Sequence, residues 1–258
     1  MGKHDVPAPD FGRTARDYAR HRPGFPPAFF EAVGRQGFGT PHQRVLDVGT
    51  GTGTLARGFA ERGVLVVGLD PSETMLAEAA ALAHADGLHV QWLRATAEDT
   101  GLRDRSFDVV CAGQCWHWFD RARAAAECRR LLDAGGRVLV AYFSYLPDPG
   151  TVGAATEELV LRHNPTWSMA GSDGRYPRWA EGLREAGFIG VESFEFDLPV
   201  SFSHEGWRGR FRACNGVLAL PAEQIVAFDQ ELQGLLDARF PEPLISRHRV
   251  FWIVGTRP

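Results

Sequence analysis

The glycine-rich segment VLDVGTGTG, from Val45 to Gly53, constrains the fold of this chain more than any other feature. It joins an apolar run typical of a buried strand to residues 51–62, which have a helical pattern. Glycines at positions 49, 51 and 53 lack a Cβ, so their backbone can form turns closed to other residues and can touch a ligand. The order strand, glycine turn, helix predicts the first unit of a parallel α/β sheet, with a cofactor against the loop.

Strand-like and helix-like segments continue to alternate after this turn, which is typical of βαβ units. Five parallel strands are expected at residues 44–49, 64–70, 90–95, 107–113 and 137–143. Helices are expected between them at residues 51–62, 72–85 and 122–136, with Ser72 as an N-cap. The pattern becomes irregular after residue 146. It resumes with helices at 178–188 and 222–240 and strands at 191–198 and 248–256.

The composition excludes several classes of function. A net charge of −4 gives no basic surface for a phosphate backbone, so nucleic acid is a disfavoured partner. Lys3 is the single lysine, which excludes Schiff-base chemistry and a P-loop. Neither a membrane span of roughly 18 apolar residues nor a secretory signal is visible, so we expect a cytoplasmic protein without a membrane partner. The four cysteines form no C-x-x-C pair, and no metal is expected.

Two carboxylates indicate which cofactor the loop binds. A dinucleotide fingerprint requires a third glycine where Thr54 stands, and Asp47 would repel a pyrophosphate while attracting an ammonium group. S-adenosylmethionine (SAM) carries such an ammonium and no phosphate. Asp70 ends the second strand roughly twenty residues after the loop, where an acidic residue commonly accepts hydrogen bonds from ribose hydroxyls. The two residues together favour SAM over a nicotinamide cofactor.

Residues 41–145 resemble the class I SAM-dependent methyltransferases, in the branch that acts on small molecules. The motifs that carry the resemblance are VLDVGTGTG, the acidic end of VVGLD, ATAEDTGL, FDVVCAGQCWHWFD and LLDAGGRVLV. The resemblance implies an α/β fold: a Rossmann-like, mostly parallel seven-stranded sheet in the order 3-2-1-4-5-7-6, with helices on both faces. It also implies an N-terminal helical lid at 1–40 and a SAM-binding domain at 41–258, with substrate-recognition insertions at about 146–176 and 199–221.

The same resemblance implies how SAM is held. The glycine loop would line its methionine part, Asp70 its ribose and residues 96–98 its adenine, although many relatives carry aspartate where Thr96 stands. In the N-terminal segment, Arg22 would pair with the methionine carboxylate, and Tyr18 would face the methyl group. The expected cofactor contacts are Tyr18, Arg22, Asp47, Gly49, Thr50, Gly51, Asp70, Pro71, Met75, Thr96, Ala97, Glu98 and Gln114.

The methyl acceptor is expected beyond the carboxyl ends of the strands. Aromatic side chains in residues 114–120 can stabilise a sulfonium by cation–π contact there, or can pack in the core. His117 is the nearest candidate for a general base; a structural or SAM-contacting role is the alternative, and His163, His204 and His248 are rivals. Aromatic and cationic residues of the insertions suit an aromatic or carboxylate-bearing acceptor, or form a solvated helix face. The expected acceptor contacts are Trp116, Trp118, Trp167, Tyr176, Trp207, Arg210 and Asn215.

The sequence therefore predicts an enzyme, monomeric or homodimeric, that methylates an O, N or C nucleophile of a small molecule, in natural-product biosynthesis. The expected by-product is S-adenosylhomocysteine (SAH). Two alternatives stay open: an NAD-dependent oxidoreductase of similar topology, and a SAM-binding protein without catalytic activity.

Overall fold

The structure is a computed structural model that describes residues 20–258. These residues form two compact units. The sheet unit consists of residues 23–143, 175–196 and 250–258, and the helical unit of residues 20–22, 144–174 and 197–249. Within residues 20–258, no helix has both the length and the apolar character needed to cross a bilayer.

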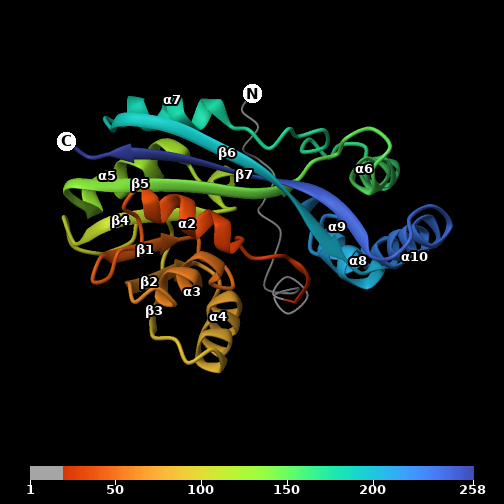
Figure 1. The fold of residues 1–258 in the computed structure, drawn as a ribbon, viewed down its shortest axis with the longest axis horizontal. Helices are drawn as coiled ribbons and strands as arrows, with labels where there is room; N and C mark the ends of the chain where they lie inside the picture. The colour runs from red at the N-terminus through yellow and green to blue at the C-terminus, as the bar shows by residue number, and fades with distance from the viewer. Residues whose placement is uncertain (1–19) are drawn as a thin grey trace. The chain divides into compact units, whose positions relative to one another are not determined.

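A single seven-stranded sheet runs in the order β3-β2-β1-β4-β5-β7-β6 (Figure 1), which confirms the order expected from the sequence. β1 pairs in parallel with β2 and β4, β2 with β3, and β4 with β5. The strands are β1 Arg44–Val48, β2 Leu65–Asp70, β3 Val90–Arg94, β4 Phe107–Gly113, β5 Leu132–Tyr145, β6 Ile189–Phe202 and β7 Leu244–Thr256. The long strands β5, β6 and β7 each contribute residues to both units.

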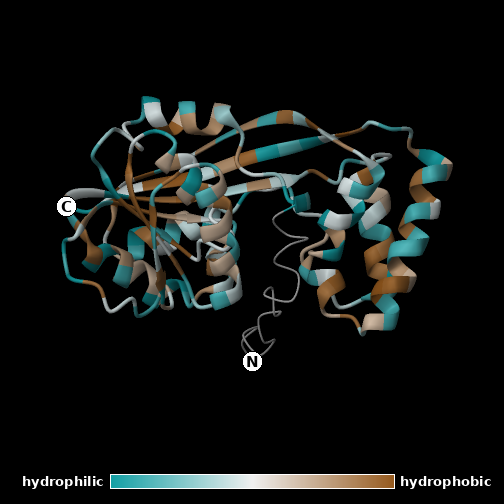
Figure 2. Cartoon of the chain, turned by 90° about the horizontal axis from the view of Figure 1, so that it is seen from below, coloured by the Kyte–Doolittle hydropathy of each residue, from teal (hydrophilic) through white to brown (hydrophobic). Residues whose placement is uncertain are grey.

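The central strands are apolar on both faces because both faces are covered. Val45 and Leu46 of β1, and Val109 and Val110 of β4, are fully buried. Figure 2 shows these strands largely in brown, as expected for parallel strands that do not meet water. The helices of the sheet unit are α2 Pro27–Arg35, α3 Thr54–Ala60, α4 Glu73–Ala85, the 3₁₀ helix η2 Trp116–Trp118, α5 Arg121–Leu131 and α7 Pro177–Glu185.

The N-terminus of α4 lies where the sequence predicts it, whereas the C-terminus of α5 does not. Ser72 caps α4 as predicted, because its Oγ accepts a hydrogen bond of 3.3 Å from the Met75 amide. The helix predicted over 122–136, however, ends at Leu131, and the following residues already belong to β5. Gly135 takes a left-handed backbone, and its amide donates to the carbonyl of Arg257 at 3.0 Å, so the chain cannot continue as a helix.

The helical unit has a hydrophobic core of its own. It contains α6 Val152–His163, α8 His204–Arg212, α9 Asn215–Leu218 and α10 Ala222–Arg239. Trp207 of α8 has 0% of its surface exposed and donates from Nε1 to Thr156 Oγ1 of α6 at 3.0 Å. The segment 146–176, which looked irregular in the sequence, thus contains a packed helix. Thr151 begins that helix by accepting a hydrogen bond of 3.4 Å from the Ala154 amide.

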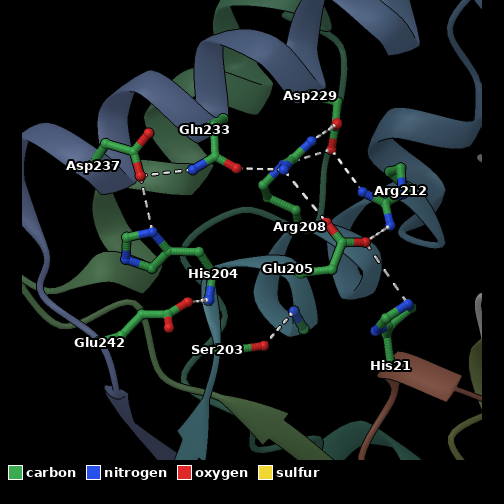
Figure 3. A network of polar contacts seen from close by, with 11 residues as sticks. His21, Ser203, His204, Glu205, Arg208, Arg212, Asp229, Gln233, Asp237 and Glu242 are labelled. Atoms are coloured by element: carbon green, nitrogen blue, oxygen red, sulfur yellow. Dashed lines mark hydrogen bonds and ion pairs between the residues drawn. The ribbon is translucent and has the colours of Figure 1, made fainter.

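A chain of charged groups joins α8 to α10 and to His21 (Figure 3). Asp229 of α10 accepts from Arg208 at 3.1 Å and from Arg212 at 2.9 Å. Glu205 receives a further bond from Arg212, at 2.5 Å, and its carboxylate lies 4.0 Å from His21 Nε2. His21 packs directly on the backbone of Gly209. A Cβ added at Gly209 would lie only 2.3 Å from the imidazole Cδ2, so the ring occupies that space. Residue His21 is therefore held against α8.

The substitution Gly209→Ala tests this contact. Alanine is worth up to about 1 kcal/mol more than glycine in a helix, so Gly234→Ala, whose Cβ would meet nothing within 4 Å, should raise the free energy of unfolding. Gly209→Ala should instead lower it by about 1–3 kcal/mol, because the new methyl group overlaps the His21 ring. Urea denaturation of the two variants measures both changes. An equal stabilisation by both would show that His21 does not pack on α8.

Candidate functional site

The glycine loop crosses the carboxyl ends of β1 and β2. Gly49, Gly51 and Gly53 have φ values of 64°, 56° and 79°, in the left-handed region that disfavours other residues. The Thr50 amide donates to the carbonyl of Leu69 at 2.9 Å, and the Gly51 amide donates to Asp70 Oδ2 at 2.9 Å. The loop is therefore held against the end of β2, as a ligand site at a sheet edge requires.

Asp47 lies beneath this loop, which corrects the role expected for it. Its side chain is only 1% exposed, so its carboxylate does not contact a ligand above the loop directly. It accepts from Thr50 Oγ1 at 2.6 Å and from the Ala56 amide, in the first turn of α3, at 3.2 Å. Gly53, the N-cap residue of α3, has no side chain, so Asp47 supplies the cap acceptor that this helix lacks. Burial is the largest cause that raises the pKa of Asp47, to about 7.

Asp70 is placed as expected at the end of β2. Its Oδ2 accepts from Gly51 and its Oδ1 from the Ser72 amide, each at 2.9 Å. Burial raises the pKa of Asp70, against the effect of these two bonds. Each carboxylate oxygen has a second lone pair, so the group can still accept two hydroxyl donors such as those of a ribose. Pro71 follows Asp70 directly, whereas Met75 is buried in the core and does not reach the surface of the site.

The backbone of Gly51 leaves room for a ligand. A Cβ built at Gly51 would meet no atom within 4 Å. At Gly53, by contrast, a Cβ would lie 2.8 Å from the ring of Trp92, and at Gly49 it would lie 2.8 Å from Phe119. The outer two glycines therefore permit close packing within the protein, while the middle glycine faces the open side of the loop.

The predicted adenine-flanking residues form a tight turn after β3. Thr96 and Asp99 form an isolated antiparallel bridge, and Ala97 between them is buried. Glu98 accepts a hydrogen bond of 2.9 Å from the Asp120 amide, which ties this turn to the segment after β4. The carboxylate of Glu98 thus has a structural bond in addition to any contact with a ligand.

The segment after β4 packs against the glycine loop. Gln114 has a left-handed backbone with φ of 65°, and its amide donates to the carbonyl of Ala141 at 2.9 Å. Its side-chain Nε2 donates to the carbonyl of Phe143 at 2.6 Å, so Gln114 is held by β5. Cys115 and Phe119 then lie against Gly49, within 3 Å of where its Cβ would be. Phe119 is one of the aromatic residues of segment 114–120 that the sequence singles out, whereas the contact of Cys115 with Gly49 depends on the fold, because the two residues are far apart in the chain.

His117 lies in the same segment and meets Tyr142 of β5. The His117 amide donates to the Tyr142 hydroxyl at 3.3 Å, and the ring Nδ1 of His117 pairs with that same hydroxyl. Tyr142 packs in turn on Tyr176 and Trp179, with ring centroids 4.6 and 4.8 Å away. Nothing in the sequence selected Tyr142, because it stands inside an apolar strand.

Several residues predicted to contact the acceptor are core residues instead. Trp116 is 1% exposed and packs edge-on against Phe119, and Trp207 fills the core of the helical unit. Their indoles cannot touch a small molecule in this structure, because no solvent reaches them. Trp118 is half-buried beside His117, with ring centroids 4.4 Å apart. The segment after β4 therefore offers Trp118 rather than Trp116 to a ligand.

Most of the remaining predicted residues belong to the helical unit, while Tyr176 belongs to the sheet unit and Tyr18 lies outside the described residues. Trp167 donates from Nε1 to Asn215 Oδ1 at 3.0 Å, and Arg210 is nearly buried, its guanidinium 5.0 Å from the ring of Tyr145. Arg22 also belongs to this unit, and its charge helps to lower the pKa of His248. Of the insertion residues predicted to contact the acceptor, Trp167, Trp207, Arg210 and Asn215 belong to this unit and Tyr176 to the sheet unit.

The rival histidines all have structural partners. His163 Nε2 lies 3.2 Å from Glu231, and His204 contacts Asp237 at 3.1 Å. His248 is fully buried, and its Nδ1 lies 3.1 Å from the carbonyl of Ser246. Burial, together with the charge of Arg210, lowers the pKa of His248 to about 3. Among residues 20–258, no three His, Cys, Asp or Glu side chains gather as a metal site would require.

Comparison with known proteins identifies the family. Residues 46–140 match a family model described as a methyltransferase domain. A ubiquinone/menaquinone biosynthesis C-methyltransferase of Dinoroseobacter shibae is 32% identical over 185 residues, which cover 64% of this chain and 74% of that protein. The chain belongs to the class I SAM-dependent methyltransferases.

Another relative and a solved structure agree with this assignment to the methyltransferases. An uncharacterized methyltransferase of Mycobacterium tuberculosis is 40% identical over 129 residues, or 50% of this chain and 49% of that protein. The chain thus matches about half the length of this curated relative. The solved structure of the YcgJ protein from Bacillus subtilis has a TM-score of 0.58 at 20% identity, over 88% of this chain and 97% of that one, and it shows the same fold. SAM, the cofactor of the family, fits the bare backbone at Gly51 and the carboxylate of Asp70.

Replacing Gly51 by alanine tests the open side of the loop. Gly51→Ala and Gly63→Ala place the same methyl group on a left-handed backbone with no atom within 4 Å, so each should cost about 1 kcal/mol of stability. Only Gly51→Ala should also weaken SAH binding, by at least tenfold in calorimetry, because its methyl group enters the space of the ligand. Equal SAH affinities in the two variants would place the ligand elsewhere.

Asp47 should make stability depend on pH. Its pKa is about 7 in the folded chain and about 3.9 in an unfolded one, so between these values the unfolded state holds fewer protons. Asp47 therefore lowers the free energy of unfolding as pH rises through this window. In Asp47→Asn this contribution disappears, so the stability of the variant relative to the native chain should rise by on the order of 2 kcal/mol from pH 5 to pH 7. Urea denaturation in both buffers measures it, and a constant difference would contradict the raised pKa.

Proposed function

We propose that this chain transfers the methyl group of SAM to a small-molecule acceptor, in a biosynthetic pathway for a natural product. The observation that carries the proposal is the open backbone of Gly51, which lies beside the carboxylate of Asp70 at the carboxyl edge of the sheet. This arrangement suits a ligand that has a ribose and a second part that approaches bare backbone, as SAM does.

The residues of the site would mainly align the acceptor with the methyl group and the sulfur of SAM. SAM, when bound, supplies an electrophilic methyl group on a sulfonium, and the neutral thioether leaves without the help of an acid. Asp70 would fix the ribose, and the left-handed loop would let the backbone approach the methionine part. Cys115 and Phe119 cover Gly49 on the side of β4 and keep water from the loop there.

The relatives support an aromatic acceptor with an oxygen or carbon nucleophile. Alongside the C-methyltransferase, a ubiquinone biosynthesis O-methyltransferase of Alkalilimnicola ehrlichii is 32% identical over 157 residues, or 62% of that protein. The names of both relatives refer to quinone biosynthesis, which involves hydroxylated aromatic rings. The neighbouring rings of Trp118 and His117, in the segment after β4, are compatible with such a ring.

Asp70→Asn tests the proposed cofactor site. The amide cannot accept from both backbone donors, and its interaction with the ribose hydroxyls loses a charge, so the KM for SAM should rise by roughly ten- to hundredfold. The assay uses SAM labelled in its methyl group with a panel of phenols and hydroquinones. Asp108→Asn is the matched control, since Asp108 pairs with Arg44 at the opposite end of the sheet.

Two results would contradict the proposal. One is an unchanged KM for SAM in Asp70→Asn together with a folded protein, which would remove Asp70 from the cofactor site. The other is binding of NAD, with no stabilisation by SAM or SAH, in thermal denaturation.

A further inference from the structure

A row of paired residues leads from the base of the glycine loop to the edge of the sheet. Asp47 of β1 pairs with Gly68 of β2, and Gly68 pairs with Trp92 of β3, the outermost strand on that side. Residues paired in neighbouring parallel strands direct their side chains to the same face of a sheet. Asp47 accepts from the Ala56 amide of α3, so Trp92 lies on the face that α3 covers.

Gly68 leaves the space that the Trp92 indole fills. Gly68 lies within β2 and is not left-handed, so its backbone conformation does not require a glycine. The space requires one, because a Cβ built there would lie 2.5 Å from Cζ3 of Trp92 and 3.1 Å from Thr50 Oγ1. Thr50 is the loop residue whose hydroxyl donates to Asp47. The indole and this hydroxyl therefore share the space above Gly68.

The same indole lies against the far end of the loop. A Cβ built at Gly53 would lie 2.8 Å from Cη2 of Trp92. Gly53 is left-handed and is the N-cap residue of α3, and its amide donates to the carbonyl of Thr50 at 2.9 Å. Thr50 and Gly53 are the two ends of the turn that contains Gly51, the glycine with the open backbone. Trp92 is therefore in place at both ends of this turn.

We propose that Trp92 is a positioning residue of the SAM site, whose indole holds Thr50 and Gly53 and thereby sets the backbone that Gly51 presents to the ligand. Trp92 acts through the loop and does not have to touch SAM. The inference rests on the proposed function, because it takes the ligand above Gly51 to be SAM. If the half-buried indole contributed packing alone, its loss would change stability and leave the loop unchanged.

Trp92→Leu and Trp252→Leu separate positioning from packing. Trp252 of β7 is a buried indole of the same unit, which packs on Phe29 and Phe194, so its loss should cost stability without changing the loop. Trp92→Leu should weaken SAH binding roughly tenfold in calorimetry, because the turn around Gly51 loses its support. Trp252→Leu should bind SAH as the native chain does. Equal SAH affinities in the two variants would overturn the proposal.

Gly68→Ala tests the same contact from the other side. Its methyl group must displace the indole or the Thr50 hydroxyl, so SAH binding should weaken although alanine suits a strand better than glycine. The double variant Gly68→Ala/Trp92→Leu has room for the methyl group, so it should bind SAH more tightly than the product of the two single effects predicts. Effects that simply multiply would contradict the proposal. If Trp92→Leu does not fold, Gly68→Ala decides, and an unchanged affinity in it would overturn the proposal.

Hydrogen exchange examines the loop without a ligand. The amides of Gly51 and Ala56 donate to Asp70 and Asp47, so their exchange reports the order of the loop. Mass spectrometry of residues 49–56 should show exchange roughly tenfold faster in Trp92→Leu than in the native chain and in Trp252→Leu. Unchanged exchange in Trp92→Leu would overturn the proposal. A native chain that binds no SAH would count against the proposed function, and exchange would still decide whether Trp92 positions the loop.

Discussion

The candidate site depends on two carboxylates that hold a strained loop from below and from the side. Asp47 joins β1 to the loop through Thr50 and to α3 through Ala56. Asp70 joins the end of β2 to the loop through Gly51. Three left-handed glycines stand between these anchors, and each bond to a carboxylate offsets part of their conformational cost. The shape offered to a ligand is thus fixed by buried acceptors, and the ligand meets mainly backbone.

Much of this arrangement can be predicted from the sequence, because it is local. The alternation of strands and helices predicts the parallel sheet, and the position of Asp70 after β2 predicts its place at the loop. The role of Asp47 was harder to predict. Its charge is visible in the sequence, whereas the direction of its side chain depends on which face of β1 packs on α3. A helix whose N-cap is glycine needs an acceptor from elsewhere, and that need was the available signal.

The contacts that sequence reasoning missed join segments far apart in the chain. Tyr142 looks like a core residue in an apolar strand, and only the fold brings its hydroxyl to His117. Trp116 and Trp207 have the residue type of a ligand contact and of a core residue alike, and their burial assigns them to the core. The helix in residues 146–176 could have been predicted from the sequence, because Val152, Ala155, Leu159 and Val160 recur at helical spacing and Thr151 gives a capping signal.

The left-handed backbone at Gln114 limits which residues this chain can carry at that position. A residue with a Cβ pays about 1–2 kcal/mol for this conformation, and a β-branched residue pays more. Glycine or asparagine would relieve the cost but would give up the bond between the glutamine side chain and Phe143. A substitution at this position therefore changes both the conformational cost of the backbone and the bond to β5. Valine and isoleucine are unfavourable in both respects, because they are β-branched and cannot donate to Phe143.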